Sequence, residues 1–298
     1  MIKPQNVEKK RSRFLRILSL LSAIRFYNLI TIAAAQYAVA VFILSLQEPT
    51  AALQDFKLHL IIFSTTLITA AGYIINNFYD SESDHINRPI KANIDGYASQ
   101  YSQLILTIFL NITAITAAFF ISLKAVAFFG FYSFLIWLYS HKIKKYAVAK
   151  WICISVVEMM PFAAIATYYN NYSKLIGLYA LFLFLIILIR QLLKDLEKIP
   201  GDFVKNYQSI AIKYGERSTK NLISVVSLPT IITAFIIINS KAIDSIRYYF
   251  YGCAILLGLF LIFINIRHTT KLFKLFHLAI KLMFTIGILN VLIANIYS

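Results

Sequence analysis

The sequence predicts an all-α polytopic membrane protein in which about nine transmembrane helices form one bundle. Hydrophobic residues make up 59% of the 298 residues, charged residues only 14%, and the mean hydropathy is +0.71. Soluble domains carry roughly a quarter charged residues, so a soluble protein of this length could not bury so much apolar surface. The apolar runs and the distribution of Lys and Arg support the same fold class.

The predicted helices follow one another along most of the chain. A helix needs about 20 apolar residues to cross a bilayer. Runs of sufficient or nearly sufficient length lie at 27–46, 58–78, 103–123, 125–140, 147–168, 174–193, 222–239, 248–266 and 274–296. The fourth run is short and its boundary with the third is soft. The runs are apolar all round, whereas strands of an outer-membrane barrel would alternate.

Lys and Arg are concentrated in alternate loops between these runs. Of the 29 in the chain, most lie before the first run or after the second, fourth, sixth and eighth. Lys281 lies inside the last run. The opposite side carries only Lys57, Lys124, Lys174, Lys241 and Arg247. Cytoplasmic loops are enriched in basic residues, so we expect the N-terminus and the active site on the cytoplasmic side of the inner (plasma) membrane.

The chain reads as one membrane domain, residues 26–298, preceded by a basic cytoplasmic flank, residues 1–25. The flank is followed by a long first apolar run with no small-residue cleavage site, so we do not expect it to be a removable signal peptide. The net charge of +16 fits topology signals and attraction to anionic membrane lipid, and we expect no nucleic-acid partner. Cys153 and Cys253 lie in apolar runs without metal-like spacing and are expected to be small buried hydrophobes.

The stretch GYIINNFYDSESDHINRP, residues 72–89, follows the second apolar run directly. Asn76, Asp80 and Asp84 are four residues apart, so a helix places them on one face. Carboxylate and amide oxygens suit a hard cation such as Mg²⁺, which substrate phosphates usually complete, and Arg88 and Lys91 follow closely. The alternative is an ordinary polar end of a membrane helix.

A second acidic segment, IRQLLKDLEKIPGD, follows the sixth run, and Pro200-Gly201 should break the helix there. Two acidic clusters on one side of the membrane could clamp a diphosphate through two cations; a solvated loop is the alternative. The members of this segment that we single out are Arg190, Lys194, Asp195, Glu197, Lys198 and Asp202.

Two further polar segments are expected on the same side. LYSHKIKKYAVAK supplies Tyr139, Lys142 and Lys145, which would cover a diphosphate or simply set the topology. Arg25 and Asn28 lie where the chain enters the first helix and could reach a phosphate.

Glu158 lies well inside the fifth predicted helix. Carboxylates in a membrane are costly and usually face a partner or a cavity, so Glu158 is a candidate base or acceptor-binding group. Lys281 is its conceivable ion-pair partner.

Together these segments resemble the motifs of the UbiA superfamily of intramembrane prenyltransferases. AAGYIINNFYDSESDHINRP is similar to its first aspartate-rich motif, LYSHKIKK to its Tyr-Ser and basic segment, IRQLLKDLEKIPGD to its second motif and RFYN to its Arg-x-x-Asn. The run KDLE followed by GD is most similar to the geranylgeranylglyceryl phosphate geranylgeranyltransferase-like branch.

The resemblance implies a helical bundle around a lipid-open cavity, dependence on Mg²⁺, and an isoprenyl diphosphate donor. The acceptor would be lipophilic, and a prenylglyceryl phosphate is what the branch implies. Asp80, Asp84 and Asp202 would be catalytic. The implied metal ligands are Asn76, Asp80, Asp84 and Asp202, to which we add Asp195 as a substitute ligand. The implied diphosphate or acceptor contacts are Arg25, Asn28, Arg88, Lys91, Tyr139, Lys142 and Lys145, to which we add Lys198 as a cation beside the diphosphate.

The chain departs from the family pattern in the second motif. Aligning its last aspartate on Asp202 places Lys198 where an aspartate belongs, and Gln191 stands where the branch commonly has Glu. A lysine cannot ligate Mg²⁺ but can neutralise a phosphate; Asp195 or Glu197 would then have to serve as ligand. Three functions therefore stay open: prenyl transfer to a lipid phosphate, prenyl transfer to an aromatic quinone precursor, and binding of an isoprenoid diphosphate without turnover.

Overall fold

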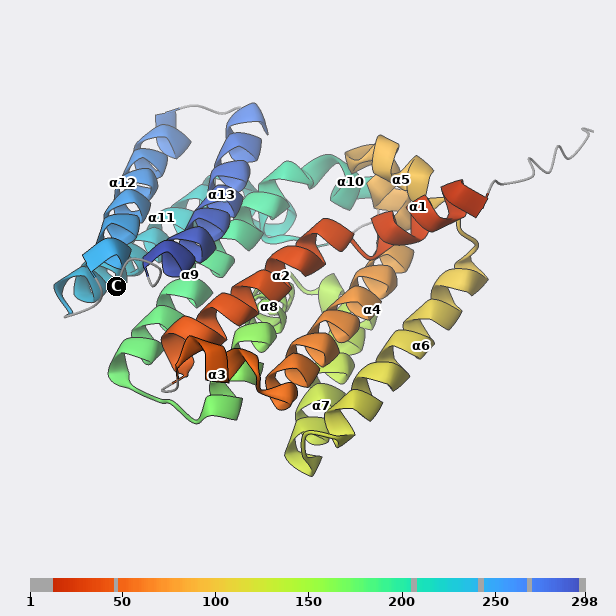
Figure 1. Cartoon of the computed structure of the whole chain (residues 1–298). Coiled ribbons are helices and arrows are strands. Elements are labelled where there is room, and N and C mark those ends of the chain that lie inside the picture. Colours follow the sequence, from red (N-terminus) through yellow and green to blue (C-terminus); the bar gives the residue numbers. More distant parts are fainter. Residues whose placement is uncertain (1–12, 46–47, 205–207, 241–243, 267–269, 295–298) are drawn as a thin grey trace, which may run out of the picture.

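The computed structural model describes residues 13–45, 48–204, 208–240, 244–266 and 270–294, which form a bundle of helices (Figure 1). In chain order the elements are α1 (Arg13–Ala23), α2 (Phe26–Val39), the π-helix η1 (Ala40–Leu44), α3 (Pro49–Leu53), α4 (Phe56–Asn87), α5 (Pro89–Asp95), α6 (Gln100–Phe119), α7 (Leu123–His141), the 3₁₀-helix η2 (Ile143–Lys145), α8 (Ala147–Tyr169), α9 (Lys174–Glu197), α10 (Ile199–Val204), α11 (Ile210–Asn239), α12 (Asp244–Ile266) and α13 (Thr270–Ala294). Within these ranges, 9 helical stretches are long and apolar enough to cross a membrane. The predicted fold class and number of spans are confirmed.

Two spans extend beyond the apolar runs that predict them. The sequence places the end of the second span near residue 78, but α4 continues to Asn87 and so carries the first acidic motif. It ends where Pro89 forces the preceding residue out of the helical region, and Arg88 has φ −146° and ψ 62°. In α11 the chain is interrupted at Gly215, whose φ of 84° favours glycine.

Short polar side chains begin several of the spans. Each accepts a hydrogen bond from a backbone N–H group that the first helical turn leaves without a partner. These caps are Asp55 for α4, Ser99 for α6, Ser122 for α7, Ser173 for α9 and Ser209 for α11. Local sequence therefore fixes where these helices start.

The N-terminal flank contains a helix that the sequence analysis does not predict. α1 is tied to α5 through Ser19, whose Oγ donates to the carbonyl oxygen of Asp95 at 2.8 Å and accepts from the N–H of Ala98 at 3.0 Å. Figure 1 shows α1, α5 and α10 at the same end of the bundle. Residues 1–12 of the predicted flank lie outside the described residues.

The hydrophobic core is divided between the two halves of the chain. One cluster joins η1, α4, α6, α7 and α8. At Gly72 of α4 an added Cβ would lie 2.8 Å from Ile136 of α7, so a small residue lets these two helices approach closely. The second cluster joins α9, α11, α12 and α13.

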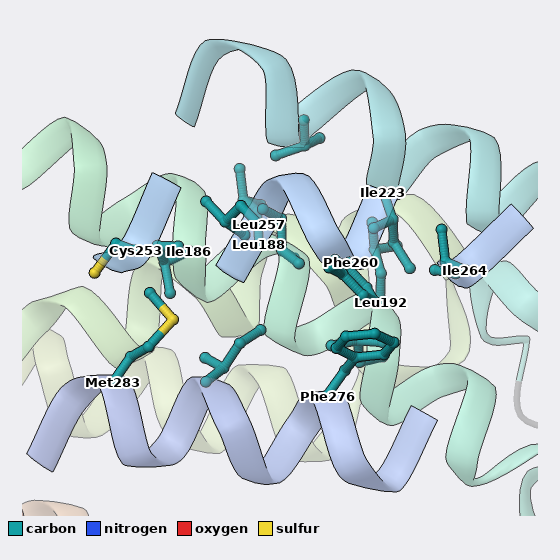
Figure 2. Packing of buried hydrophobic residues seen from close by; sticks show 14 of the residues in the cluster. Ile186, Leu188, Leu192, Ile223, Cys253, Leu257, Phe260, Ile264, Phe276 and Met283 are labelled. Atoms are coloured by element: carbon teal, nitrogen blue, oxygen red, sulfur yellow. The ribbon is translucent and has the colours of Figure 1, made fainter. Parts of the chain in front are cut away.

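Figure 2 shows the packing of the second cluster. The rings of Phe260 and Phe276 lie 4.2 Å apart between centroids, and Cys253 is buried in the same cluster. Cys153 is half-buried, so both cysteines serve as the apolar residues that the sequence predicts. In a bilayer such packing is stabilised mainly by van der Waals contact.

Candidate active site

Three polar segments meet at one end of the bundle: the C-terminal part of α4, η2 with the first turn of α8, and the break between α9 and α10. Direct contacts join them. Lys144 of η2 contacts Asp80 of α4, and Lys150 of α8 contacts Asp195 of α9. The side-chain amide of Asn87 donates to the carbonyl oxygen of Lys198 at 3.5 Å. The polar segments that sequence reasoning places on one side therefore lie together.

The predicted column of Asn76, Asp80 and Asp84 lies on continuous helix, as its spacing requires. Lys144 Nζ donates to Asn76 Oδ1 at 2.6 Å and to Asp80 Oδ1 at 2.5 Å. Asp80 is 3% exposed and Lys144 5% exposed, so this ion pair is shielded from water. A buried charge needs such a partner.

Asp84 is the member of the column with an open ligand position. Its Oδ1 atom is buried and has no hydrogen-bond partner among the described residues. Within the described ranges no group of three His, Cys, Asp or Glu side chains is placed to hold a metal ion. Mg²⁺ is usually held by one or two carboxylates, waters and substrate phosphates, so the column fits a cation that a bound diphosphate completes.

Basic groups surround the end of α4. Arg88 is close to Asp84, and burial lowers the pKa of the Arg88 guanidinium from its usual value. Lys91 Nζ donates to Asn77 Oδ1 at 3.0 Å and pairs with Asp95. Burial also lowers the pKa of Lys91. Burial thus disfavours the charged forms of both side chains, and an anion placed beside them would stabilise those charged forms.

The second acidic segment is organised around Lys150. Its Nζ lies 2.9 Å from Asp195 Oδ1 and 3.4 Å from Asp202 Oδ2. The other oxygen of Asp195 accepts the backbone N–H of Ile210 at 3.2 Å. Burial raises the pKa of the Asp202 carboxyl, although Lys150 and Lys198 oppose the shift. Asp195 therefore uses both oxygens within the protein.

The remaining residues of this segment lie around the predicted helix break. α9 ends at Glu197 and α10 starts at Ile199, so the break falls at Lys198, just before Pro200. Glu197 Oε1 is 2.8 Å from Nδ1 of His277. The Lys198 side chain is close enough to Asp80 and Asp202 to act on both electrostatically. Lys198 therefore lies between the two acidic segments.

Glu158 lies in the interior of α8, as predicted, but its partners differ from the expected one. Its carboxylate pairs with Arg190 and, at 3.3 Å, with Lys194. The suggestion of Lys281 as partner is therefore wrong; α9, the span that follows α8, supplies both cations. Nε of Arg190 is buried without a hydrogen-bond partner in the described part of the chain. Two cations against one carboxylate leave a local excess of positive charge.

Arg25 and Asn28 extend this basic region from the start of α2. Arg25 has φ 52° and ψ 54°, a left-handed conformation that is uncommon for a residue other than glycine. Its guanidinium lies 4.9 Å from the centroid of the Tyr73 ring. Tyr73 is also close to Asn28, Glu158 and Arg190. The predicted Arg-x-x-Asn segment and the Glu158 cluster therefore face the same region.

The basic segment after α7 contains both buried and exposed side chains. Tyr139 is buried, whereas Lys142 and Lys145 are exposed. The two lysines that reach acidic groups, Lys144 and Lys150, are missed by sequence reasoning. Of the two, only Lys150 could have been found from the sequence. It lies one turn inside a predicted membrane helix, where an unpaired cation is costly, and this indicates a buried acidic partner.

Comparisons with known proteins agree with this architecture. Residues 28–286 match the model of the UbiA prenyltransferase family. Digeranylgeranylglyceryl phosphate synthase of Korarchaeum cryptofilum is 28% identical over 60% of this chain and 63% of its own length. The enzyme of the same name from Thermococcus sibiricus is 31% identical over 62% of this chain and 66% of its own length. The chain thus aligns with somewhat less than two thirds of these relatives.

Solved structures share the fold along nearly the whole chain. A structure of digeranylgeranylglyceryl phosphate synthase in membranes superposes with a TM-score of 0.70 and 20% identity, covering 95% of this chain and 99% of the other. A UbiA homologue from Archaeoglobus fulgidus bound to DMAPP and Mg²⁺ gives 0.68 and 14%, covering 93% and 98%. At these identities the likeness shows the fold alone.

Proposed function

This chain belongs to the UbiA prenyltransferase family, and we propose that it transfers an isoprenyl group from an isoprenyl diphosphate to a lipophilic acceptor that carries a phosphate. The observation that carries the proposal is the Asn76–Asp80–Asp84 column. One buried oxygen of Asp84 has no hydrogen-bond partner in the described part of the chain, Arg88 lies close to Asp84, and Lys144 and Lys198 act on Asp80. Acidic ligands beside excess cations suit a metal-bound diphosphate better than either ion alone.

The donor's diphosphate is held by the residues around α4. Asn76, Asp80 and Asp84 would hold Mg²⁺, which supplies stabilisation of the negative charge that develops on the departing diphosphate. Lys144 neutralises Asp80 before a cation arrives. Arg88 and Lys198 approach the same region from α4 and α9.

In the reaction the bond between the isoprenyl carbon and the diphosphate oxygen breaks, and the electron pair leaves with the diphosphate. An acceptor oxygen forms the new carbon–oxygen bond, and its proton is taken up by the departing diphosphate. The chain contributes electrostatic stabilisation that is in place before the reaction and a site shielded from water. Glu158 is a poor candidate for the base, because Arg190 and Lys194 both stabilise its ionised form.

The acceptor class follows from the region of Arg25, Arg190 and Lys194. Arg190 and Lys194 pair with Glu158, Arg25 lies close enough to Lys194 to act on it electrostatically, and the buried Nε of Arg190 can donate to a further acceptor. A phosphate oxygen supplies that acceptor and the missing negative charge. The name shared by the two relatives supports a prenylglyceryl phosphate, whereas a neutral aromatic ring would leave the excess charge in place.

We place the site on the cytoplasmic side of the inner (plasma) membrane. The chain is a multi-pass membrane protein, and the polar end of the bundle carries the loops that are richest in Lys and Arg. Anionic membrane lipid around these loops would be attracted to them.

The function is tested with purified protein in detergent, Mg²⁺, geranylgeranyl diphosphate and a panel of acceptors. The panel contains a prenylglyceryl phosphate, the matching prenylglycerol without phosphate, and an aromatic quinone precursor. We expect diphosphate release and an ether product with the phosphate-bearing lipid. Faster product formation with the aromatic ring would overturn the acceptor class.

A second candidate, binding of the donor without turnover, is favoured by the two lysines of the second acidic segment, Lys150 and Lys198. Tight donor binding together with no diphosphate release for any acceptor would establish this candidate and exclude the first.

A further inference from the structure

The second acidic segment offers few open oxygens for a metal ion. Asp195 is occupied on one oxygen by Lys150 and on the other by the N–H of Ile210. Glu197, the other possible substitute for the missing aspartate, is paired with His277. Only Asp202 remains, and Lys150 Nζ already lies 3.4 Å from its Oδ2. A divalent cation therefore does not fit this segment as it fits the column on α4.

Lys150 is buried and bonded to two carboxylates, Asp195 and Asp202. It lies in the first turn of α8 and is 8% exposed, while Asp195 and Asp202 are 6% and 3% exposed. Asp195 also binds the start of α11. Displacing the ammonium would leave a buried lysine without a partner and loosen α11, and retaining it beside a divalent cation would bring like charges together.

The carboxylates of this segment already have partners within the protein. Lys150 pairs with Asp195 and Asp202, Lys198 also acts on Asp202 electrostatically, and Glu197 lies against His277. On α4, by contrast, Lys144 pairs with Asp80, and one buried oxygen of Asp84 has no hydrogen-bond partner in the described part of the chain.

We propose that the ammonium of Lys150 is a built-in replacement for the second cation of the diphosphate clamp, so that this chain binds a single divalent ion, at the α4 column. The inference rests on the proposed function for the presence of a diphosphate. The Lys150 bridge joins α8, α9 and α10 and holds Lys198, at the α9–α10 break, toward the diphosphate as a direct cationic contact.

The stoichiometry of Mn²⁺ tests the proposal without a substitution. The wild-type protein in detergent is saturated with Mn²⁺ and a thio-substituted geranylgeranyl diphosphate that resists cleavage, and bound Mn²⁺ is counted by equilibrium dialysis and electron paramagnetic resonance. We expect one Mn²⁺ per chain and a spectrum without spin coupling between ions. Two coupled ions per chain, or none, would overturn the proposal.

A variant pair tests the role of Lys150 itself. In K150M/K198D the segment regains an acid and loses both lysines, and we expect a second, spin-coupled Mn²⁺ and a larger rise in melting temperature with Mn²⁺ than in wild type. K174M, an exposed lysine at the start of α9, is the matched control and should bind one ion. If the double variant unfolds, the wild-type stoichiometry still decides. Absence of product in the acceptor panel counts against the proposed function and not against the metal count.

Discussion

The acidic segment on α4 and the acidic segment at the α9–α10 break contain the same side-chain types but leave different atoms without a partner. On α4 the Oδ1 atom of Asp84 is buried and open. At the break, Asp195 uses both oxygens on Lys150 and Ile210. The first segment therefore leaves a buried carboxylate oxygen open to an added ion, whereas at the break Asp195 has protein partners for both oxygens.

Burial disfavours the charged form of ionisable groups at both segments. Burial lowers the pKa of Arg88 and of Lys91 beside α4, and raises the pKa of Asp202 at the break. Near α4 the desolvated groups considered are the cations Arg88 and Lys91, and an anionic ligand would stabilise their charged forms. At the break the desolvated group is the Asp202 carboxylate, which Lys150 already pairs with. Similar acidic motifs in a sequence thus perform different tasks.

The largest effect is expected from the α4 column. Asp80→Ala and Asp84→Ala each remove a ligand of the proposed cation, and we expect turnover to fall by about three orders of magnitude or more, because the charge on the departing diphosphate loses its main stabilisation. Diphosphate release in detergent measures this. Glu82→Gln, an exposed acid on the same helix, is the control and should keep wild-type turnover. Substantial activity in Asp84→Ala would place the cation elsewhere.

The second prediction concerns stability at the break. Lys150→Met leaves Asp195 and Asp202 buried without their cation, and removal of one member of a buried ion pair costs about 3–5 kcal/mol. We expect a lower melting temperature in the presence of a chelator, by an amount that Lys174→Met does not reproduce, since exposed substitutions stay within about 0.5 kcal/mol. Equal melting temperatures for the two variants would show that the bridge does not stabilise the bundle.

Hydropathy was sufficient to predict the fold, because a backbone inside a bilayer has to satisfy its own hydrogen bonds as helix. The four-residue spacing of Asn76, Asp80 and Asp84 likewise predicts that they share a helix face, because that depends only on the helical period. Hydropathy does not predict α1. The position of α1 depends on a hydrogen bond from Ser19 to the carbonyl oxygen of Asp95 at the end of α5, 76 residues further along the chain. Such a contact is invisible to local pattern.

The site was predicted less completely than the fold. Within the segment from Tyr139 to Lys150 the sequence offers several lysines, and η2 interrupts the helical phase that would tell which of them points inward. Lys144 and Lys150 are the buried ones, while Lys142 and Lys145 are exposed. The diphosphate roles of the exposed pair stay predictions. The partner of Glu158 was missed for a related reason, because ion pairing between spans depends on helix rotation that hydropathy does not specify.

The third prediction separates the acceptor region from both acidic segments. Arg190→Met removes a charged donor from the proposed acceptor phosphate, worth about 1.5–3 kcal/mol. We expect KM for the prenylglyceryl phosphate to rise roughly tenfold or more, with donor affinity unchanged. Arg217→Met, an exposed arginine on α11, is the control. An equal loss with the prenylglycerol that lacks the phosphate would show that Arg190 acts on the fold and not on the acceptor.

The smallest effect concerns the solvation of charge beside α4. Burial holds the pKa of Lys91 below its usual 10.5, so the folded state disfavours the charged form of this lysine. The stability that depends on Lys91 is therefore lost as pH falls through the folded pKa. It is regained as pH rises toward 10.5. Relative to Lys91→Met, the wild-type melting temperature in detergent should therefore increase between pH 8 and about pH 10.5. Lys91→Arg keeps its charge throughout this window and should show no such increase relative to Lys91→Met. A bound diphosphate analogue should flatten the wild-type dependence of melting temperature on pH, because an anion beside Lys91 stabilises the charged form that burial destabilises. If the analogue leaves this pH dependence unchanged, the diphosphate binds away from the end of α4.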